Sequence, residues 1–353
     1  MKISENALLE LLNEQDLTFC TSKFTPSQLA HLYVSSALLI EVMSFIKEQL
    51  WLQDKLDQDL DIKTTYEKFI SPFFLNELKE IVFLQEFLIK SGSGNISNVL
   101  KNAKTIEKNI LKLIKTRSKD DMKSFLIESL KEMKSHFLSE EKFKEAQDQS
   151  LGYQGLRLYR TFDRLDDIFN LNYSLDLNMD IDRVTKERLY QGSGVGVQSG
   201  YSTILLALHR IEAEVGSTVI DLGSGYGRVG LVCSLLRPDI NFIGYEYVPH
   251  RVDISNIACK ALGLDEKLDF KVQDLSLKSF KIPDADYYYL YDPFSEETYK
   301  YILDQIIEIS TRKKVTIVTK GNARGWLSDI AKKYAWPKAV YIDESNLCIF
   351  SSL

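Results

Sequence analysis

Apolar residues recur with two different spacings along the chain, and the change of spacing divides it into two regions. Up to about Phe169 they recur with the spacing of amphipathic helices. The stretches with this spacing are Leu29–Leu52, Phe73–Lys90, Val99–Lys115 and Met122–Phe137. From about residue 190 onward, short runs of β-branched or aromatic residues alternate with helical stretches. The pattern therefore predicts an all-helical region followed by an α/β region.

Residues that favour helix starts support the first prediction. In Thr25–Gln28, a threonine can cap the helix, a proline follows in the first turn, and a glutamine occupies the third position. Ser71-Pro72 repeats the cap and the proline, and Ser118–Asp121 has the pattern of a capping box. Ser91–Asn95, rich in glycine and serine, is the clearest flexible joint in this half. We see no fixed-period repeat, which argues against a solenoid.

One helix of this region carries a row of lysines. Their spacing places five ammonium groups on one helical face: Lys101, Lys104, Lys108, Lys112 and Lys115. Charged rows of this kind are usually solvated outer faces, and we favour that interpretation. The alternative is a docking face for an acidic partner or a phosphate backbone. Because nothing else in this region carries catalytic chemistry, we expect it to recognise substrate or to dimerise.

Composition places the chain among soluble globular proteins. Of its 353 residues, 44% are hydrophobic and 27% are charged, and the formal net charge is -6. This balance argues against an extended nucleic-acid groove. The start of the chain has no apolar signal segment, and no uninterrupted apolar run is long enough to span a bilayer. The cysteines and histidines have no metal-ligand spacing, so we expect reduced thiols, no metal, no membrane and a cytoplasmic location.

A polar segment rich in Asp and Asn, Leu171–Arg188, separates the two regions. We therefore predict a helical domain over residues 1–170, a linker over 171–189 and an α/β domain over 190–353. The α/β domain begins with Tyr190–Tyr201, in which glycines lie among polar and aromatic residues. This stretch is either an inert linker or a mobile loop that closes over a ligand. Its immediate entry into a helical segment favours the mobile loop.

Strand and helix patterns then alternate as in a doubly wound sheet. After a first strand that begins at Val219, the predicted strands are Asn241–Glu246, Leu268–Asp274, Asp286–Asp292, Lys314–Thr319, Lys338–Ile342 and Asn346–Ser351. Helical segments follow the first, second, fourth and fifth strands, whereas the last two strands are too close together for a helix and suggest an antiparallel hairpin. We therefore predict a doubly wound, mostly parallel, seven-stranded α/β sheet preceded by an all-α domain.

The first strand leads into a glycine-rich turn, Asp221-Leu222-Gly223-Ser224-Gly225-Tyr226-Gly227. An acid ends the β-branched run, and helical spacing resumes at Val229. Alternate glycines allow a tight turn and leave the backbone at a helix N-terminus open to a ligand. The spacing is G-x-G-x-G rather than G-x-G-x-x-G, and the acid precedes the glycines. Both details argue against a nicotinamide cofactor.

This turn resembles motif I of the class I S-adenosylmethionine-dependent methyltransferases. The five strand–helix units and the closing hairpin resemble the whole domain of that family, over roughly residues 190–353. The resemblance implies that S-adenosyl-L-methionine is the cofactor. Ligands of such sheets bind at the carboxyl ends of the strands, where acids end the predicted strands.

The resemblance implies a role for each acid. Asp221 would help hold the ammonium of the methionyl group, and Glu246 would accept hydrogen bonds from two ribose hydroxyls. Asp274 would accept a hydrogen bond from the exocyclic amine of adenine. The alternative for Glu246 is a surface acid at a strand end, and the alternative for Asp274 is an ordinary turn residue.

The turn and the preceding loop would form the rest of the cofactor site. Gly223, Gly225 and Gly227 would let the backbone approach the cofactor where a Cβ would clash. In many members of the family, the segment before the first strand folds over the methionine half of the cofactor. The resemblance therefore implies that Tyr190 and Gln198 take part in binding.

Asp292-Pro293-Phe294 follows the fourth predicted strand, where the acceptor enters in this family. Methyltransferases that act on amino groups often carry Asn/Asp-Pro-Pro-Tyr/Phe here, and this chain matches that motif in part, with one proline. The match implies that Asp292 orients a nitrogen nucleophile and takes its proton, while Phe294 packs against it. The alternative is a simple turn, for which Asp-Pro is a common sequence.

Residues from Tyr190 to about Asp292 are most similar to the non-SET histone lysine methyltransferases of the disruptor-of-telomeric-silencing type. The shared features are the turn over 221–229, the Gly244–Glu246 strand end and a polar aromatic loop ahead of both. The chain departs from that family at Asp292-Pro-Phe, where the family is Asn-rich, and at Tyr190-Gln-Gly, where the family has Tyr-Gly-Glu. The resemblance implies methyl transfer to a nitrogen, first of all a protein lysine. A small-molecule N- or O-methyltransferase and a catalytically silent cofactor-binding scaffold are the alternatives.

Overall fold

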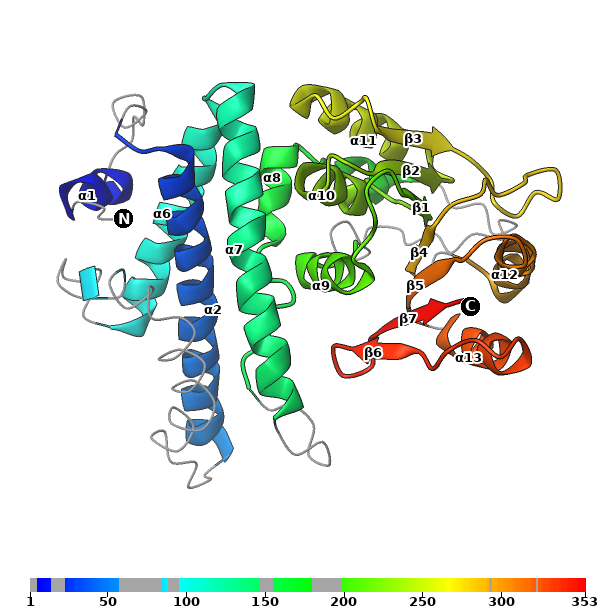
Figure 1. Ribbon diagram of the computed structural model, residues 1–353. Coiled ribbons are helices and arrows are strands. Elements are labelled where there is room, and N and C mark those ends of the chain that lie inside the picture. Colours follow the sequence, from blue (N-terminus) through cyan, green and yellow to red (C-terminus); the bar gives the residue numbers. More distant parts are fainter. Residues whose placement is uncertain are drawn as a thin grey trace. The chain divides into compact units, whose positions relative to one another are not determined.

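The computed structural model describes residues 5–13, 23–56, 84, 86–87, 95–146, 155–179, 198–291, 294–321 and 323–353. Contacts between residues divide the chain into two compact units, Met1–Ile168 and Phe169–Leu353. Figure 1 shows the helices of the first unit in blue to green and the sheet of the second unit in green to red. We call them the helical unit and the sheet unit and describe each separately.

The helical unit is built from amphipathic helices, as the apolar spacing predicts. Its elements are α1 (Glu5–Asn13), α2 (Pro26–Leu56), α6 (Ile96–Lys115), α7 (Lys119–Glu145), a short 3-10 turn η4 (Asp163–Leu165) and α8 (Asp166–Phe169), which extends across the boundary. Both predicted capping sequences in the described part are confirmed. Thr25 and Gln28 exchange side-chain-to-backbone hydrogen bonds at the start of α2, and Ser118 accepts from the N–H of Asp121 at the start of α7.

Helix α2 forms the centre of the helical unit and packs against both α6 and α7. Tyr33 of α2 packs its ring against Phe125 of α7 and against Phe162. The segment Pro26–Leu52 is long and apolar enough to cross a membrane, but 67% of its most apolar window is buried inside the structure, as is common for a core helix. The helix predicted over Phe73–Lys90 lies outside the described residues, apart from three positions within it.

The lysine row lies on the outer face of α6. All five lysines are exposed, whereas the other positions from Val99 to Ile114 are buried or half-buried. We find no ion pair to any of the five among the described residues. The acid on this helix, Glu107, is buried and pairs instead with Arg164 at 2.6 Å. These observations agree with a solvated face, while a partner for it stays a prediction.

The sheet unit contains the predicted seven-stranded, mostly parallel sheet, in the order β3-β2-β1-β4-β5-β7-β6. The strands are β1 (Thr218–Leu222), β2 (Asn241–Glu246), β3 (Leu268–Val272), β4 (Tyr287–Tyr291), β5 (Thr316–Lys320), β6 (Val340–Ile342) and β7 (Leu347–Ser351). The first five are parallel where they pair, and β7 is antiparallel to both β5 and β6. The doubly wound class and the antiparallel edge hairpin are therefore confirmed.

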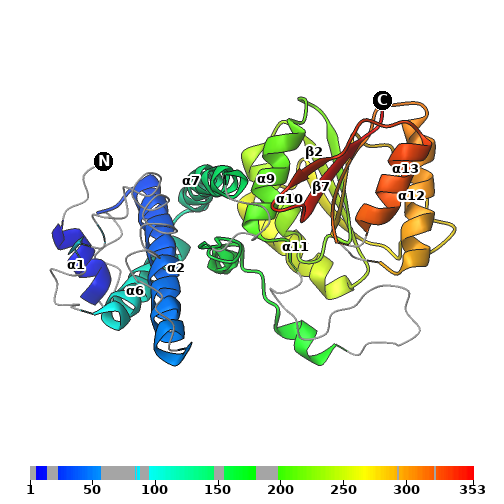
Figure 2. The same cartoon turned by 90° about the horizontal axis from the view of Figure 1, so that it is seen from below.

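Helices cover both faces of this sheet, as Figure 2 shows. Helices α9 (Tyr201–Ile211), α10 (Arg228–Leu236) and α11 (Pro249–Leu262) lie on one face, and α12 (Glu296–Ser310) and α13 (Ala323–Lys333) lie on the other. The central strands β1, β4 and β5 are buried over most of their length, as expected for parallel strands covered on both faces.

The expected linker over 171–189 differs from the structure in its first part. Residues Ser174–Asn178 form a 3-10 turn, η5, that belongs to the sheet unit, and Asp176 within it is fully buried. An Asp/Asn-rich sequence reads as a solvated linker, but here the charge of Asp176 is neutralised by Arg251, which is distant in sequence. The part of the expected linker after Met179 lies outside the described residues.

Candidate functional site

The glycine-rich turn is held against the end of the neighbouring strand. The N–H groups of Gly223 and Ser224 both donate to the carbonyl oxygen of Tyr245, each at 2.9 Å. Gly223, Gly225 and Gly227 all have positive φ angles, of 93°, 54° and 77°. Glycine adopts this conformation without the cost that a Cβ would impose, which explains why the turn needs glycine at alternate positions.

The surroundings of two of these glycines differ in how much room they leave for a side chain. A Cβ on Gly227 would lie 2.6 Å from Cζ of Phe270 and 2.8 Å from Oγ of Ser255. A Cβ on Gly225 would lie 3.0 Å from Nε2 of Gln198. Gly227 therefore permits packing of the turn against the sheet, whereas Gly225 faces the side chain from the preceding loop.

Asp221 lies at the carboxyl end of β1 and is 2% exposed. Burial raises the pKa of Asp221 well above its usual range, and the nearby Glu246 carboxylate raises it further. We find no hydrogen bond or ion pair to the Asp221 carboxylate among the described residues. Ser224, on the turn, likewise has a buried hydroxyl without a partner in the described part. A ligand bound at this edge would supply partners for these groups.

Glu246 ends the neighbouring strand β2 and is 6% exposed. Its Oε2 accepts a hydrogen bond from the N–H of Gly225 at 2.9 Å, and its Oε1 accepts one from the N–H of Val248 at 3.0 Å. Burial raises the pKa of Glu246, although the positive charge of Arg251 and these two hydrogen bonds oppose the shift. The backbone therefore fixes the orientation of the carboxylate, and each oxygen retains a lone pair for a hydroxyl donor.

The loop before α9 is anchored to the same end of the sheet. Arg228, the first residue of α10, donates to the carbonyl oxygen of Ser199 at 2.9 Å, and its guanidinium lies over the ring of Tyr201. The hydroxyl of Tyr289 in β4 donates to the hydroxyl of Ser199. These contacts place Gln198, predicted to bind the cofactor, against the glycine turn. Tyr190, from the same prediction, lies outside the described residues.

Asp274 follows β3 at the same edge of the sheet. Its Oδ1 accepts hydrogen bonds from the N–H and the hydroxyl of Ser276 at 2.9 and 2.6 Å. These bonds are those of an ordinary Asp turn, so the structure provides a local reason for this residue beside its predicted contact with adenine. Tyr247, next to Glu246, is 37% exposed and offers a ring on which a base can stack. Tyr247 could not be predicted from the sequence, because a single exposed aromatic residue carries no periodic signal.

The predicted acceptor residues are described in part. Asp292 and Pro293 lie outside the described residues. Phe294 is 1% exposed and packs edge-on against Tyr299 of α12, with ring centroids 5.1 Å apart. This packing places Phe294 in the core of the sheet unit. Before this motif, Tyr291 ends β4, and its ring lies under the ammonium of Lys320, which ends β5.

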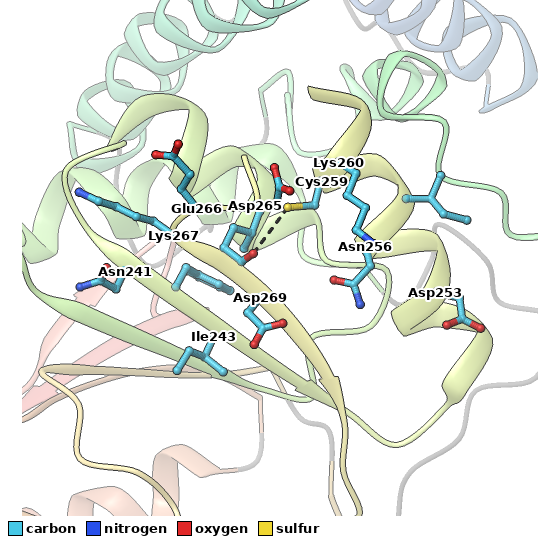
Figure 3. A pocket seen from close by; sticks show the side chains of 13 residues that line it. Asn241, Ile243, Asp253, Asn256, Cys259, Lys260, Asp265, Glu266, Lys267 and Asp269 are labelled. Atoms are coloured by element: carbon cyan, nitrogen blue, oxygen red, sulfur yellow. Dashed lines mark hydrogen bonds between the residues drawn. The ribbon is translucent and has the colours of Figure 1, made fainter. Parts of the chain in front are cut away.

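A hollow of about 980 Å³ lies away from these residues, along β3 and α11 (Figure 3). Its lining includes the first residues of β2 and β3, Asn241 and Leu268. Cys259 at its wall donates its thiol to the carbonyl oxygen of Leu268, and burial raises the pKa of Cys259 to about 11. A thiol with this pKa is not a nucleophile at neutral pH.

Asp221 and Glu246 at the carboxyl ends of their strands, and Asp274 just after β3, thus lie at the same edge of the sheet as the glycine turn and Gln198. Buried carboxylates and an open turn suit a ligand that combines a cationic group with a diol. Within the described part, no group of three or more His, Cys, Asp or Glu side chains is placed to hold a metal ion.

No protein-family model and no curated protein matches the sequence. Similar solved structures include a precorrin-6y C5,15-methyltransferase from Geobacter metallireducens, 14% identical with a TM-score of 0.35, over 44% of this chain and 90% of that one. TrmN from Thermus thermophilus is 18% identical with a TM-score of 0.35, over 43% of this chain and 48% of that one. An RNA methyltransferase from Salinibacter ruber, solved with S-adenosyl-L-homocysteine, is 18% identical with a TM-score of 0.32, over 42% of this chain and 88% of that one. At these identities and TM-scores, the likeness carries no argument about the function of this chain.

Proposed function

We propose that the sheet unit binds S-adenosyl-L-methionine and transfers its methyl group to a nitrogen acceptor. The observation that carries the proposal is the buried Asp221 carboxylate, which has no partner in the described part and lies beside a second buried carboxylate, Glu246. A cationic ligand would offset the cost of burying these acids. The cofactor brings such a cation in its ammonium group, together with a ribose diol for Glu246.

Each described residue at this edge has a chemical task in the proposal. Asp221 would hold the ammonium, Glu246 would accept from the ribose hydroxyls, and Tyr247 would stack on the adenine. Gln198 would meet the cofactor from the loop side, because its amide already lies against Gly225. When bound, the cofactor supplies a methyl group on a positively charged sulfur, which leaves as a neutral thioether once the acceptor lone pair has formed the new bond. The protein then has to position a neutral nucleophile rather than supply a strong base.

For the acceptor we propose an amine, and a protein lysine in particular. The support is the sequence resemblance in the turn over 221–229 and in the strand end Gly244–Glu246.

The proposal is tested in two steps with the full chain. First, calorimetry with S-adenosyl-L-homocysteine measures whether the cofactor site exists, and absence of binding would refute the proposal. Second, the protein is incubated with a fractionated lysate and S-adenosyl-L-methionine labelled on the methyl group, with the Glu246→Ala variant as a control. Label in a protein band that depends on Glu246 supports the protein acceptor. Label confined to small molecules or nucleic acid would refute that acceptor while retaining methyl transfer.

A further inference from the structure

One buried ion pair attaches the turn η5 to the cofactor end of the sheet. Asp176 has no exposed surface, and Nε and Nη2 of Arg251 donate to its two oxygens at 3.2 and 3.0 Å. Nε2 of His250 lies 2.9 Å from the same carboxylate. Burial alone would raise the pKa of Asp176, but the hydrogen bonds from Arg251 and His250 outweigh burial and lower it. Asp176 is therefore a charged, fully satisfied anchor.

Arg251 also faces the carboxylate that would bind ribose. Its third nitrogen, Nη1, lies 3.7 Å from Oε1 of Glu246. That distance is too long for a direct hydrogen bond. The guanidinium is therefore placed between two buried acids, with two nitrogens bonded to Asp176 and one only near Glu246.

The same segment packs against the glycine turn. The ring of Tyr173, just before η5, lies edge-on to the ring of Tyr226, with centroids 4.6 Å apart. The guanidinium of Arg251 also lies over the ring of Tyr226, with its Cζ 5.7 Å from the ring centroid. Tyr226 is fully buried in the turn between Gly225 and Gly227. Residues 173–176 thus contact both parts of the proposed cofactor site, the turn directly and Glu246 through Arg251.

We propose that Asp176 is a positioning residue for the ribose of the cofactor, because it holds Arg251 away from Glu246. The inference rests on the proposed function, in which Glu246 accepts the ribose hydroxyls. Without the charge of Asp176, the guanidinium loses its fixed partner. It would then turn onto Glu246 in a two-bond pair and compete with the ribose for the same oxygens.

The test measures the affinity of the full chain for S-adenosyl-L-homocysteine by calorimetry. Asp176→Asn keeps the shape of the side chain and removes its charge, and we expect the dissociation constant to rise about tenfold or more. Asp239→Asn is the matched control, because Asp239 also pairs with the fork of an arginine, Arg237, but precedes β2 at the opposite end of the strands. We expect this control to bind as the wild type does.

The double variant Asp176→Asn/Arg251→Met separates positioning from a purely structural role. Removing the competing guanidinium should restore the dissociation constant of the double variant to within about threefold of the wild-type value, because both partners of the buried pair are then gone. If Asp176 only stabilised the fold, the Asp176→Asn variant would unfold at a lower urea concentration but would bind the ligand as the wild type does while it stays folded. Two results would overturn the inference and leave the proposed function intact, provided that the wild type binds S-adenosyl-L-homocysteine. One is an unchanged dissociation constant in Asp176→Asn, and the other is a dissociation constant of the double variant that stays as high as that of Asp176→Asn. Failure of the wild type to bind overturns the proposed function itself.

Discussion

Asp221 and Glu246 lie at the carboxyl ends of two neighbouring parallel strands, and the charge of Glu246 adds to the rise in pKa that burial imposes on Asp221. Glu246 is oriented by two backbone N–H groups, whereas Asp221 has no partner in the described part of the chain. The unliganded site is therefore electrostatically unfavourable, and a bound cation would relieve it. This relationship makes the site testable without knowledge of the acceptor.

The first prediction separates stability from binding at Asp221. Replacing Asp221 by Asn removes a buried charge, whose unsatisfied burial costs about 1–3 kcal/mol or more. We expect the unliganded Asp221→Asn variant to unfold at the same denaturant concentration as the wild type or at a higher one. We also expect S-adenosyl-L-homocysteine to stabilise the wild type but not the variant. Asp269→Asn, at an exposed acid on β3, is the control that should change neither property.

The second prediction concerns pH. Because the folded-state pKa of Asp221 is raised, the folded state binds more protons than the unfolded state between the unfolded pKa of about 4 and the raised folded value. The contribution of Asp221 to the free energy of unfolding of the unliganded protein should therefore decrease as the pH rises through this window. Asp176, with a lowered pKa, acts in the opposite sense, and its contribution is lost as the pH falls below about 4. Urea unfolding from pH 4 to 8 should show a flatter profile for Asp221→Asn than for the wild type, and parallel profiles would contradict the assignment.

The fold could be predicted from sequence because its signals are local and repeated. The buried runs of β1, β2 and β4 and the helix starts at Thr25 and Ser118 each follow from the residues at those positions. The strand ends were less accurate, since β3 ends at Val272 rather than at Asp274. Asp274 instead forms a turn with Ser276, a side-chain bond that periodicity does not reveal.

The sequence predicts the main-chain features of the candidate site but not the contacts between its side chains. Glycine spacing and terminal acids indicate a turn beside strand ends, and the structure places Asp221, Glu246 and Gln198 together there. The ion pair between Asp176 and Arg251 could not be predicted, because its partners lie far apart in sequence and neither belongs to a motif. Phe294 illustrates the same limit, since an aromatic residue after a strand can line a site or fill the core.

The third prediction tests the ribose contact. Glu246→Ala should weaken binding of S-adenosyl-L-homocysteine, because each lost charge-assisted hydrogen bond is worth roughly 1.5–3 kcal/mol. Glu246→Gln should weaken it less, since the amide oxygen can still accept one of the bonds that Glu246 now receives from Gly225 and Val248. Calorimetry with the wild type and both variants measures the order of their affinities for S-adenosyl-L-homocysteine. Equal affinity for the wild type and the Ala variant would mean that the ribose is bound elsewhere.

The fourth prediction distinguishes the two turn glycines. Gly227→Ala brings a Cβ to 2.6 Å from the buried ring of Phe270 at a positive φ, so we expect a loss of about 1–3 kcal/mol in the free energy of unfolding, or more. Gly225→Ala meets the flexible amide of Gln198 at 3.0 Å, which can move. We expect Gly225→Ala to lose less stability but to weaken cofactor binding by displacing Gln198. Denaturation curves and calorimetry on both variants measure the two effects, and the reverse order of stabilities would be inconsistent with the packing.

The last prediction concerns the acceptor. If the acceptor is a lysine, its amine is protonated at neutral pH, with an unperturbed pKa of about 10.4. The turnover rate should then rise with pH between about 7 and 9 as the neutral amine becomes more abundant. Asp292→Ala should lower the turnover rate strongly and leave the affinity for S-adenosyl-L-homocysteine nearly unchanged.

Phe294 requires a different substitution, because its ring is buried against Tyr299. Phe294→Ala would remove core packing at a cost of about 3–5 kcal/mol and would confuse folding with catalysis. Phe294→Leu keeps most of the apolar volume. If the ring contacts the acceptor, turnover by Phe294→Leu falls although the protein stays folded and binds cofactor. If the ring serves only the core, turnover by Phe294→Leu is retained. A turnover rate that does not change with pH, together with full activity in Asp292→Ala, would refute the amine acceptor and leave residues 292–294 as a turn.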